Sequence, residues 1–156
     1  ENYDTNLKMN PPLRTKEDIE ALWEGLKDGT IDVIASDHAP HSIEEKDVEF
    51  DAAPFGILGL ETMLAVVITK VVNKGVISLE DAIEKMSITP RKLLNLPVPK
   101  IKKGSNANMT IFNPTQKWTV DVHKFKSLSR NAPFHGWELD GFVTATVNKG
   151  LYNLNA

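Results

Sequence analysis

Residues 31–41 have the sequence IDVIASDHAPH, in which a short apolar run leads into a polar segment. The run 31–35 is rich in β-branched residues and mostly apolar on both faces, which is typical of a buried parallel strand. Asp37 and His41 follow at its carboxyl end, where parallel α/β folds bind their ligands. A carboxylate there suits metal binding or proton transfer. A loop-capping role for Asp37 stays open, because two such residues at this spacing are common by chance.

Helices are predicted on both sides of this strand. Thr15, an acidic first turn and apolar residues at helical spacing predict a helix that Gly29 ends. Residues 42–53 are polar and acidic and are predicted to form a long surface loop. Three more helices are predicted after this loop: about 59–73, from Ser78 through Met86, and a short one from Thr89-Pro90.

The composition changes after Leu96, where prolines punctuate the chain and strand-like segments follow. The sequence Asn148-Lys149-Gly150 is typical of a hairpin turn. The predicted strands are 108–112, 117–120, 142–148 and 151–154.

Composition excludes several classes of protein. The chain has 156 residues, a mass of 17.3 kDa, a formal net charge of −3 and no cysteine. Disulfide frameworks, thiolate zinc sites and cysteine nucleophiles are therefore excluded. The slight acidity predicts no nucleic-acid partner, and the longest apolar run, 57–72, is too short and too charged to span a bilayer. The polar start shows no secretory signal, so a cytoplasmic location is expected.

Four segments in order carry a family resemblance. They are DTNLKMNPPLR at 4–14, IASDHAPH at 34–41, APFGILGLET at 53–62 and SNANMTIFNP at 105–114. The first three together closely resemble the dihydroorotase family of the amidohydrolase superfamily, in its longer type I form. The fourth is similar to the segment by which that superfamily enters its small β domain.

The resemblance implies an α/β fold in two parts. Residues 1–96 would be the C-terminal part of a (β/α)8 TIM-like hydrolase barrel, with the loop after strand seven, strand eight and the following helices. Residues 97–156 would supply the C-terminal strands of a small β-sandwich domain. A complete barrel needs about 250 residues, and the family's H-x-H metal pair is absent from this sequence. We therefore expect a C-terminal portion whose partner is the N-terminal portion of the same enzyme, and which is inactive alone.

The same resemblance implies a reaction and a site. Dihydroorotases reversibly close N-carbamoyl-L-aspartate to L-dihydroorotate in pyrimidine (UMP) biosynthesis, with a zinc-activated hydroxide in the hydrolytic direction. Two zinc ions would serve the complete enzyme, with most ligands outside this chain. Asp37 matches the residue that ligates metal and shuttles the proton. Asn10 and His41 match positions that hold the substrate, and the backbone of Phe55 and Gly56 matches the segment that binds the ring amide.

Simpler roles remain open for several of these residues. Asn10 before a proline is also typical of a turn, and His41 is also suited to stabilising a loop. His38 is expected to be structural, because Asp37 already occupies the strand end. Lys8 and Arg14 would either steer an anionic substrate or be solvated loop cations.

Two other activities of the parent protein stay open. One is another cyclic amidohydrolase, of the dihydropyrimidinase or allantoinase type. The other is a non-catalytic dihydroorotase-like subunit that scaffolds aspartate transcarbamoylase. A homodimer and an association of the active enzyme with aspartate transcarbamoylase are the further partners that the resemblance allows.

Overall fold

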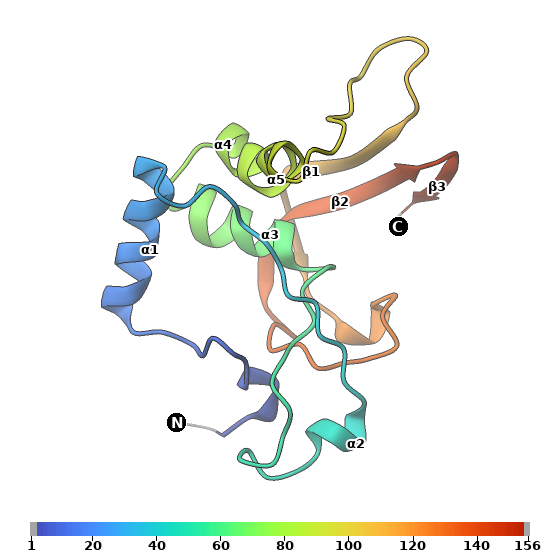
Figure 1. The fold of residues 1–156 in the computed structure, drawn as a ribbon. Helices are drawn as coiled ribbons and strands as arrows, with labels where there is room; N and C mark the ends of the chain where they lie inside the picture. Colours follow the sequence, from blue (N-terminus) through green and yellow to red (C-terminus); the bar gives the residue numbers. More distant parts are fainter. Residues whose placement is uncertain (1–2, 155–156) are drawn as a thin grey trace.

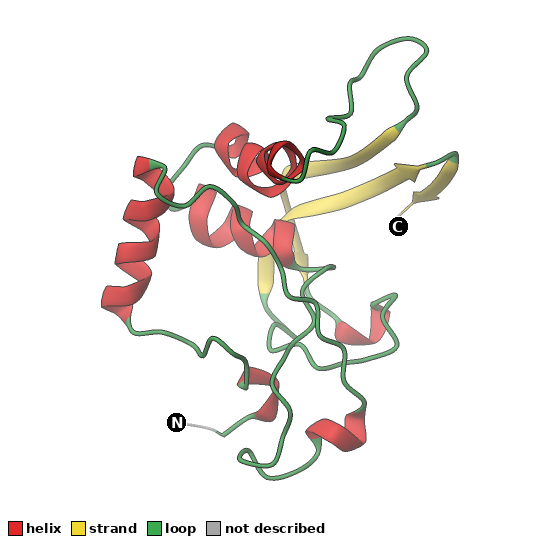
Figure 2. Cartoon of the chain, viewed as in Figure 1, coloured by secondary structure: helices red, strands yellow, loops and turns green. Residues whose placement is uncertain are grey.

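The computed structural model describes residues 3–154, and α3, α4 and α5 lie beside one long β-ribbon (Figure 1). Helix α1 stands apart from the group α3, α4 and α5, and loops dominate the region around the N-terminus and α2 (Figure 2). The elements are η1 Thr5–Leu7, α1 Lys16–Asp28, α2 Ile43–Lys46, α3 Met63–Val67, η2 Ile68–Val72, α4 Leu79–Ile83, η3 Glu84–Ile88, α5 Thr89–Leu93, β1 Asn108–Thr119, η4 Val122–Lys124, β2 Glu138–Asn148 and β3 Leu151–Leu154. Of the elements labelled η, η1 and η4 are 3-10 helices, and η2 and η3 are π-helices.

Helix α1 confirms the end signals predicted from the sequence. The Thr15 side chain accepts a hydrogen bond from the Asp18 N–H, and the Asp18 carboxylate accepts one from the Thr15 N–H. This reciprocal capping box satisfies two backbone donors that the first turn leaves free. Gly29 ends the helix in the left-handed conformation, at φ +83°.

The later helices differ from the prediction in their bounds. The helix expected over 59–73 begins at Met63, because residues 59–62 form a turn. The two helices expected from Ser78 and from Thr89 form one continuous run, α4–η3–α5. Pro90 has no N–H to offer the preceding turn, and the Thr89 N–H instead bonds the Glu84 carbonyl as a π-turn. The acidic loop contains one short helix, α2, which Ser42 caps.

The sheet is an antiparallel meander in the order β1-β2-β3. The two strands predicted over 108–112 and 117–120 are one strand, β1, whose register against β2 shifts twice. The second shift lies between Asn113 and Lys117 and contains Pro114, which has no N–H for the ladder. The predicted hairpin turn is confirmed: Lys149 and Gly150 both have positive φ, as a two-residue type I′ turn requires.

The strand predicted over 31–35 is extended chain without a ladder, so that prediction is wrong for the described residues. A strand needs a neighbouring strand to bond, and here the neighbours are helices. The Ile34 N–H donates to the Lys85 carbonyl at 3.1 Å, and the Ile31 carbonyl accepts from the Lys85 Nζ at 2.5 Å. An isolated parallel bridge joins His38 to Ile57 immediately afterwards.

The buried core joins residues 97–154, which we call the β region, to the segments that precede them. Ala65 of α3 packs with Val120 and with Leu139 of β2. In a second cluster, Leu58 packs with Val122 and Ala132. The β region therefore lies directly against the segment around Leu58. Within residues 3–154, no helix has both the length and the apolar character needed to cross a membrane.

Candidate active site

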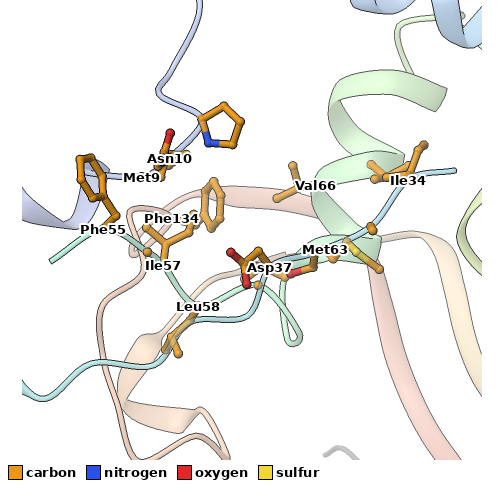
Figure 3. A pocket seen from close by; sticks show the side chains of 17 residues that line it. Met9, Asn10, Ile34, Asp37, Phe55, Ile57, Leu58, Met63, Val66 and Phe134 are labelled. Atoms are coloured by element: carbon orange, nitrogen blue, oxygen red, sulfur yellow. The ribbon is translucent and has the colours of Figure 1, made fainter. Parts of the chain in front are cut away.

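A cavity of about 380 Å³ lies where four separate parts of the chain meet (Figure 3). Its lining includes four of the five residues predicted to form the site: Asn10, Asp37, Phe55 and Gly56. The fifth, His41, does not line it. Apolar side chains complete the wall, among them Met63 and Val66 from α3 and Phe134 from the β region.

Asp37 is the free carboxylate of this cavity. Its side chain is exposed, and within residues 3–154 it makes no hydrogen bond or ion pair. In Figure 3 it lies between Ile57 and Met63. The bridge between His38 and Ile57 fixes the chain immediately after it.

A carboxylate with unengaged oxygens suits a zinc ligand. The described part of the chain contains no group of three or more His, Cys, Asp or Glu that could hold a metal ion. Asp37 is therefore suited to supply one ligand, and a complete metal site would need ligands from elsewhere. That most metal ligands lie outside this chain stays a prediction.

The segment that carries Asn10 is fastened to the segment that carries Gly56. The Gly56 N–H donates to the Lys8 carbonyl at 3.0 Å. The Lys8 Nζ donates to the carbonyls of Phe50 at 2.7 Å and Asp51 at 2.9 Å. Lys8 thus binds carbonyl groups of the acidic loop and does not line the cavity.

A buried lysine joins the same two segments by a second set of hydrogen bonds. Lys46 is only 6% exposed. Its Nζ donates to the carbonyls of Thr5 at 3.0 Å and Pro54 at 2.8 Å, and its own carbonyl accepts from the Thr5 hydroxyl at 2.6 Å. Burial lowers the pKa of Lys46 from its ordinary value of 10.5, and the positive charge of Lys8 adds to this.

Replacing Lys46 with methionine should destabilise the folded protein by about 1–3 kcal/mol, because two part-buried carbonyls lose their donor. The pH dependence provides a second readout. The folded state releases the Lys46 proton more readily than the unfolded state, so the wild type gains stability as pH rises toward 10.5. The Lys46→Met variant lacks this gain. Thermal unfolding of both proteins between pH 8 and 10.5 measures the difference, and parallel curves would contradict it.

His41 is engaged by the protein itself. Its Nε2 lies 3.0 Å from the Phe55 carbonyl, which can only accept, so Nε2 is the donor. Its Nδ1 lies 3.4 Å from the Glu45 carboxylate. The Ser42 N–H lowers the pKa of Glu45, and His41 contributes in the same direction. In this structure His41 has the loop-stabilising role that the sequence left open.

Gly56 is required by the residues that lie close to it in space. Its φ is +125°, and a Cβ added there would lie 2.5 Å from the Ala39 Cβ and 3.3 Å from the His41 Nε2. A missing Cβ suits the close approach of a substrate to the backbone at this position, where the resemblance implies that the ring amide binds. The structure shows that it also permits close packing against residues 39–41.

His38 is structural, as expected. Its Nδ1 accepts hydrogen bonds from the backbone N–H groups of Gly59 at 3.2 Å and Leu60 at 3.4 Å. These bonds hold the turn that precedes α3.

Two residues of the β region near this site were not predicted. Phe134 contributes an aromatic wall to the cavity, and Asn131 is 3% exposed and bonded to the site segments. The only local signal is the sequence Arg130-Asn131-Ala132-Pro133-Phe134 within an otherwise strand-like region, which does not indicate what either side chain contacts.

The chain belongs to the amidohydrolase family, whose model matches residues 5–151. Among curated relatives it is 53% identical over 154 residues to the dihydroorotase of Clostridioides difficile, covering 99% of this chain and 36% of that protein. It is 50% identical over 149 residues to the dihydroorotase of Caldanaerobacter subterraneus, covering 96% of this chain and 34% of that protein. The chain thus spans about a third of the length of the curated relatives it matches.

Solved structures show the same architecture. The chain matches an L-hydantoinase (dihydropyrimidinase) from Arthrobacter aurescens with a TM-score of 0.86 at 34% identity, covering 99% of this chain and 36% of that one. A dihydropyrimidinase from Brevibacillus agri matches with a TM-score of 0.84 at 28% identity, covering 97% and 34%. The fold is therefore that of the corresponding part of an amidohydrolase.

Proposed function

We propose that the longer protein containing this chain is a dihydroorotase, and that this chain supplies its proton-transfer carboxylate and part of its substrate pocket. The observation that carries the proposal is the unengaged Asp37 carboxylate in a cavity that Asn10 and the Phe55–Gly56 backbone also line. The curated relatives at about 50% identity bear the name dihydroorotase, which supports the choice of substrate.

Asp37 acts in two roles in this proposal. A zinc ion, when bound, lowers the pKa of a water molecule and polarises the substrate carbonyl. Asp37 is one ligand of the metal and is also the general base that takes the proton of the attacking water. It then returns that proton as a general acid to the ring nitrogen that leaves. In the synthetic direction the same carboxylate accepts the proton from the attacking carbamoyl nitrogen.

The substrate is held by neutral donors and acceptors. The Asn10 amide is neutral, so its N–H group donates a hydrogen bond to the substrate carboxylate without repelling that negative charge. The backbone of Phe55 and Gly56 binds the ring amide. The hydrogen bonds of Lys8 and Lys46 keep that backbone close to Asn10. The His41 Nε2 donates to the Phe55 carbonyl in this structure. For this N–H group to bind the substrate, its hydrogen bond to Phe55 must first break.

The finer assignments follow the same proposal. Residues 1–96 form the C-terminal part of a TIM-like barrel, and residues 97–156 form strands of a small β-sandwich domain. The complete enzyme holds two zinc ions and serves cytoplasmic pyrimidine biosynthesis, as a homodimer or together with aspartate transcarbamoylase. The N-terminal portion of the same enzyme is the required partner. The exposed apolar side chains of α1, Ile19 at 40% and Leu22 at 50%, are consistent with such a partner, because an amphipathic helix normally buries that face.

A second candidate is the hydrolysis of another cyclic amide. The hydantoinase and dihydropyrimidinase structures support it, although their identity of 34% or less is below that of the dihydroorotase relatives. Both activities use the same type of carboxylate, so the geometry of Asp37 alone does not separate them.

Side-by-side assays of the full-length enzyme test the choice. L-dihydroorotate, hydantoin and allantoin are supplied to the zinc-loaded protein, and kcat/KM is measured for each. We expect dihydroorotate to be preferred by about 100-fold or more, since a pocket built for a carboxylate strongly rejects analogues that lack it. Preference for hydantoin or allantoin would establish the second candidate. No turnover of any of the three would favour the non-catalytic scaffold.

A further inference from the structure

Asn131 connects the β region to both backbone segments of the candidate site. Its side-chain Nδ2 donates to the carbonyls of Ala39 at 2.9 Å and Gly56 at 3.2 Å. Its Oδ1 accepts from the His41 N–H at 3.2 Å. All three bonds are made by one side chain of a residue that is 3% exposed.

The backbone of Asn131 strengthens the same connection. Its carbonyl accepts from the Leu58 N–H at 3.0 Å. The neighbouring Ala132 packs with Leu58 in the buried core. Residues 39–41 and 56–58 are loop segments, so few of their own backbone groups are paired within regular structure. Asn131 therefore supplies bonds that the loops cannot supply for themselves.

We infer that Asn131 is a positioning residue that sets the distance between the Ala39–His41 loop and the Phe55–Gly56 backbone. This inference rests on the proposed function, in which the Phe55–Gly56 backbone binds the substrate ring. Asn131 does not line the cavity and makes no bond to Asp37, so it acts on substrate binding through the backbone and leaves proton transfer untouched. Loss of the amide should loosen the binding segment in the ground state and the transition state alike.

The test uses Asn131→Leu in the full-length enzyme, because leucine keeps the branched shape and the number of side-chain heavy atoms of asparagine but has no polar atoms. An interaction that binds substrate and transition state equally changes KM and spares kcat. We expect KM for dihydroorotate to rise about tenfold, as for buried groups left unpaired, with kcat within about threefold of wild type. Asn131→Ser, which retains one hydroxyl, should give an intermediate KM. It also serves as the second variant if the leucine variant does not fold.

Asn73→Leu is the matched control. The Asn73 amide also joins a preceding segment, the end of η2, to the β region, through Asp140 at 2.9 Å, but it makes no hydrogen bond to residues 39–41 or 56–58. This variant should leave KM at the wild-type value. A folded Asn131→Leu or Asn131→Ser enzyme with KM within about twofold of wild type would overturn the inference. An equal KM rise in Asn73→Leu would overturn it as well.

Hydrogen exchange separates this inference from the proposed function. Amide exchange at residues 39–41 and 56–58 should accelerate in Asn131→Leu and stay unchanged in Asn73→Leu, whichever substrate the enzyme uses. Unchanged exchange in these segments would overturn the positioning role. If the wild type turns over hydantoin and rejects dihydroorotate, the proposed function fails, and the KM comparison is made with hydantoin.

Discussion

The Asp37→Asn variant of the full-length enzyme should lose about 10³-fold or more in kcat, because general acid–base catalysis by one side chain contributes about 10²–10⁴-fold and Asp37 also ligates metal in the proposal. Asparagine keeps the size of the side chain but neither takes nor returns a proton at neutral pH. Since no protein group bonds the Asp37 carboxylate in the described residues, the substitution breaks no structural contact there. The measurement is kcat for dihydroorotate, with bound metal counted by elemental analysis.

Asp32→Asn is the matched control for this substitution. Asp32 is exposed, lies on the same extended segment and does not line the cavity. Its variant should retain wild-type kcat and metal content. An Asp37→Asn enzyme that keeps more than about a tenth of wild-type kcat would contradict the assigned proton transfer.

The Gly56→Ala variant should lose about 3 kcal/mol or more of folding stability, since it combines backbone strain with overpacking. At φ +125° an alanine is strained, and its Cβ would be placed 2.5 Å from the Ala39 Cβ, which has no rotamer through which to move away. Relief requires the two segments to separate. KM should therefore rise in any fraction that folds. Thermal unfolding and steady-state kinetics measure the two effects.

Gly136→Ala separates the two contributions. Gly136 also has a positive φ, +79°, but an added Cβ there meets nothing within 4 Å. It should cost only the conformational strain, about 1–2 kcal/mol, and should leave KM unchanged. If the two alanine variants were equally stable, close packing at Gly56 would have no energetic role.

Local signals in the sequence were sufficient for elements that depend on adjacent residues. The Thr15 cap, the Ser78 cap and the Lys149-Gly150 turn are confirmed because each involves groups within about four residues of one another. The strand over 31–35 failed for the opposite reason. Its existence depends on a pairing partner that no property of those five residues supplies.

In the candidate site, too, the residues within local motifs were predictable and the residues that support them through distant contacts were not. The ordered motifs around Asn10, Asp37 and Phe55–Gly56 predicted residues that the fold does bring to one cavity. The groups that hold them were not predictable: Lys46 is surrounded by acidic residues in the sequence and is expected to be solvated. Its burial against Thr5 and Pro54 depends on the path of the whole loop.

The bonds of Asn131 also set an order of events during synthesis. The asparagine comes 92 residues after Ala39 and 75 after Gly56, so both loops leave the ribosome before the amide that links them has been made. At a translation rate of about 5–20 residues per second, the Asp37 loop waits roughly 5–20 s for this partner. During that interval helix α1 can already form, because its caps are local. The cavity that Asp37 lines is accordingly completed late in synthesis, and a ribosome-bound chain that ends before residue 131 should carry the aspartate without an ordered cavity around it.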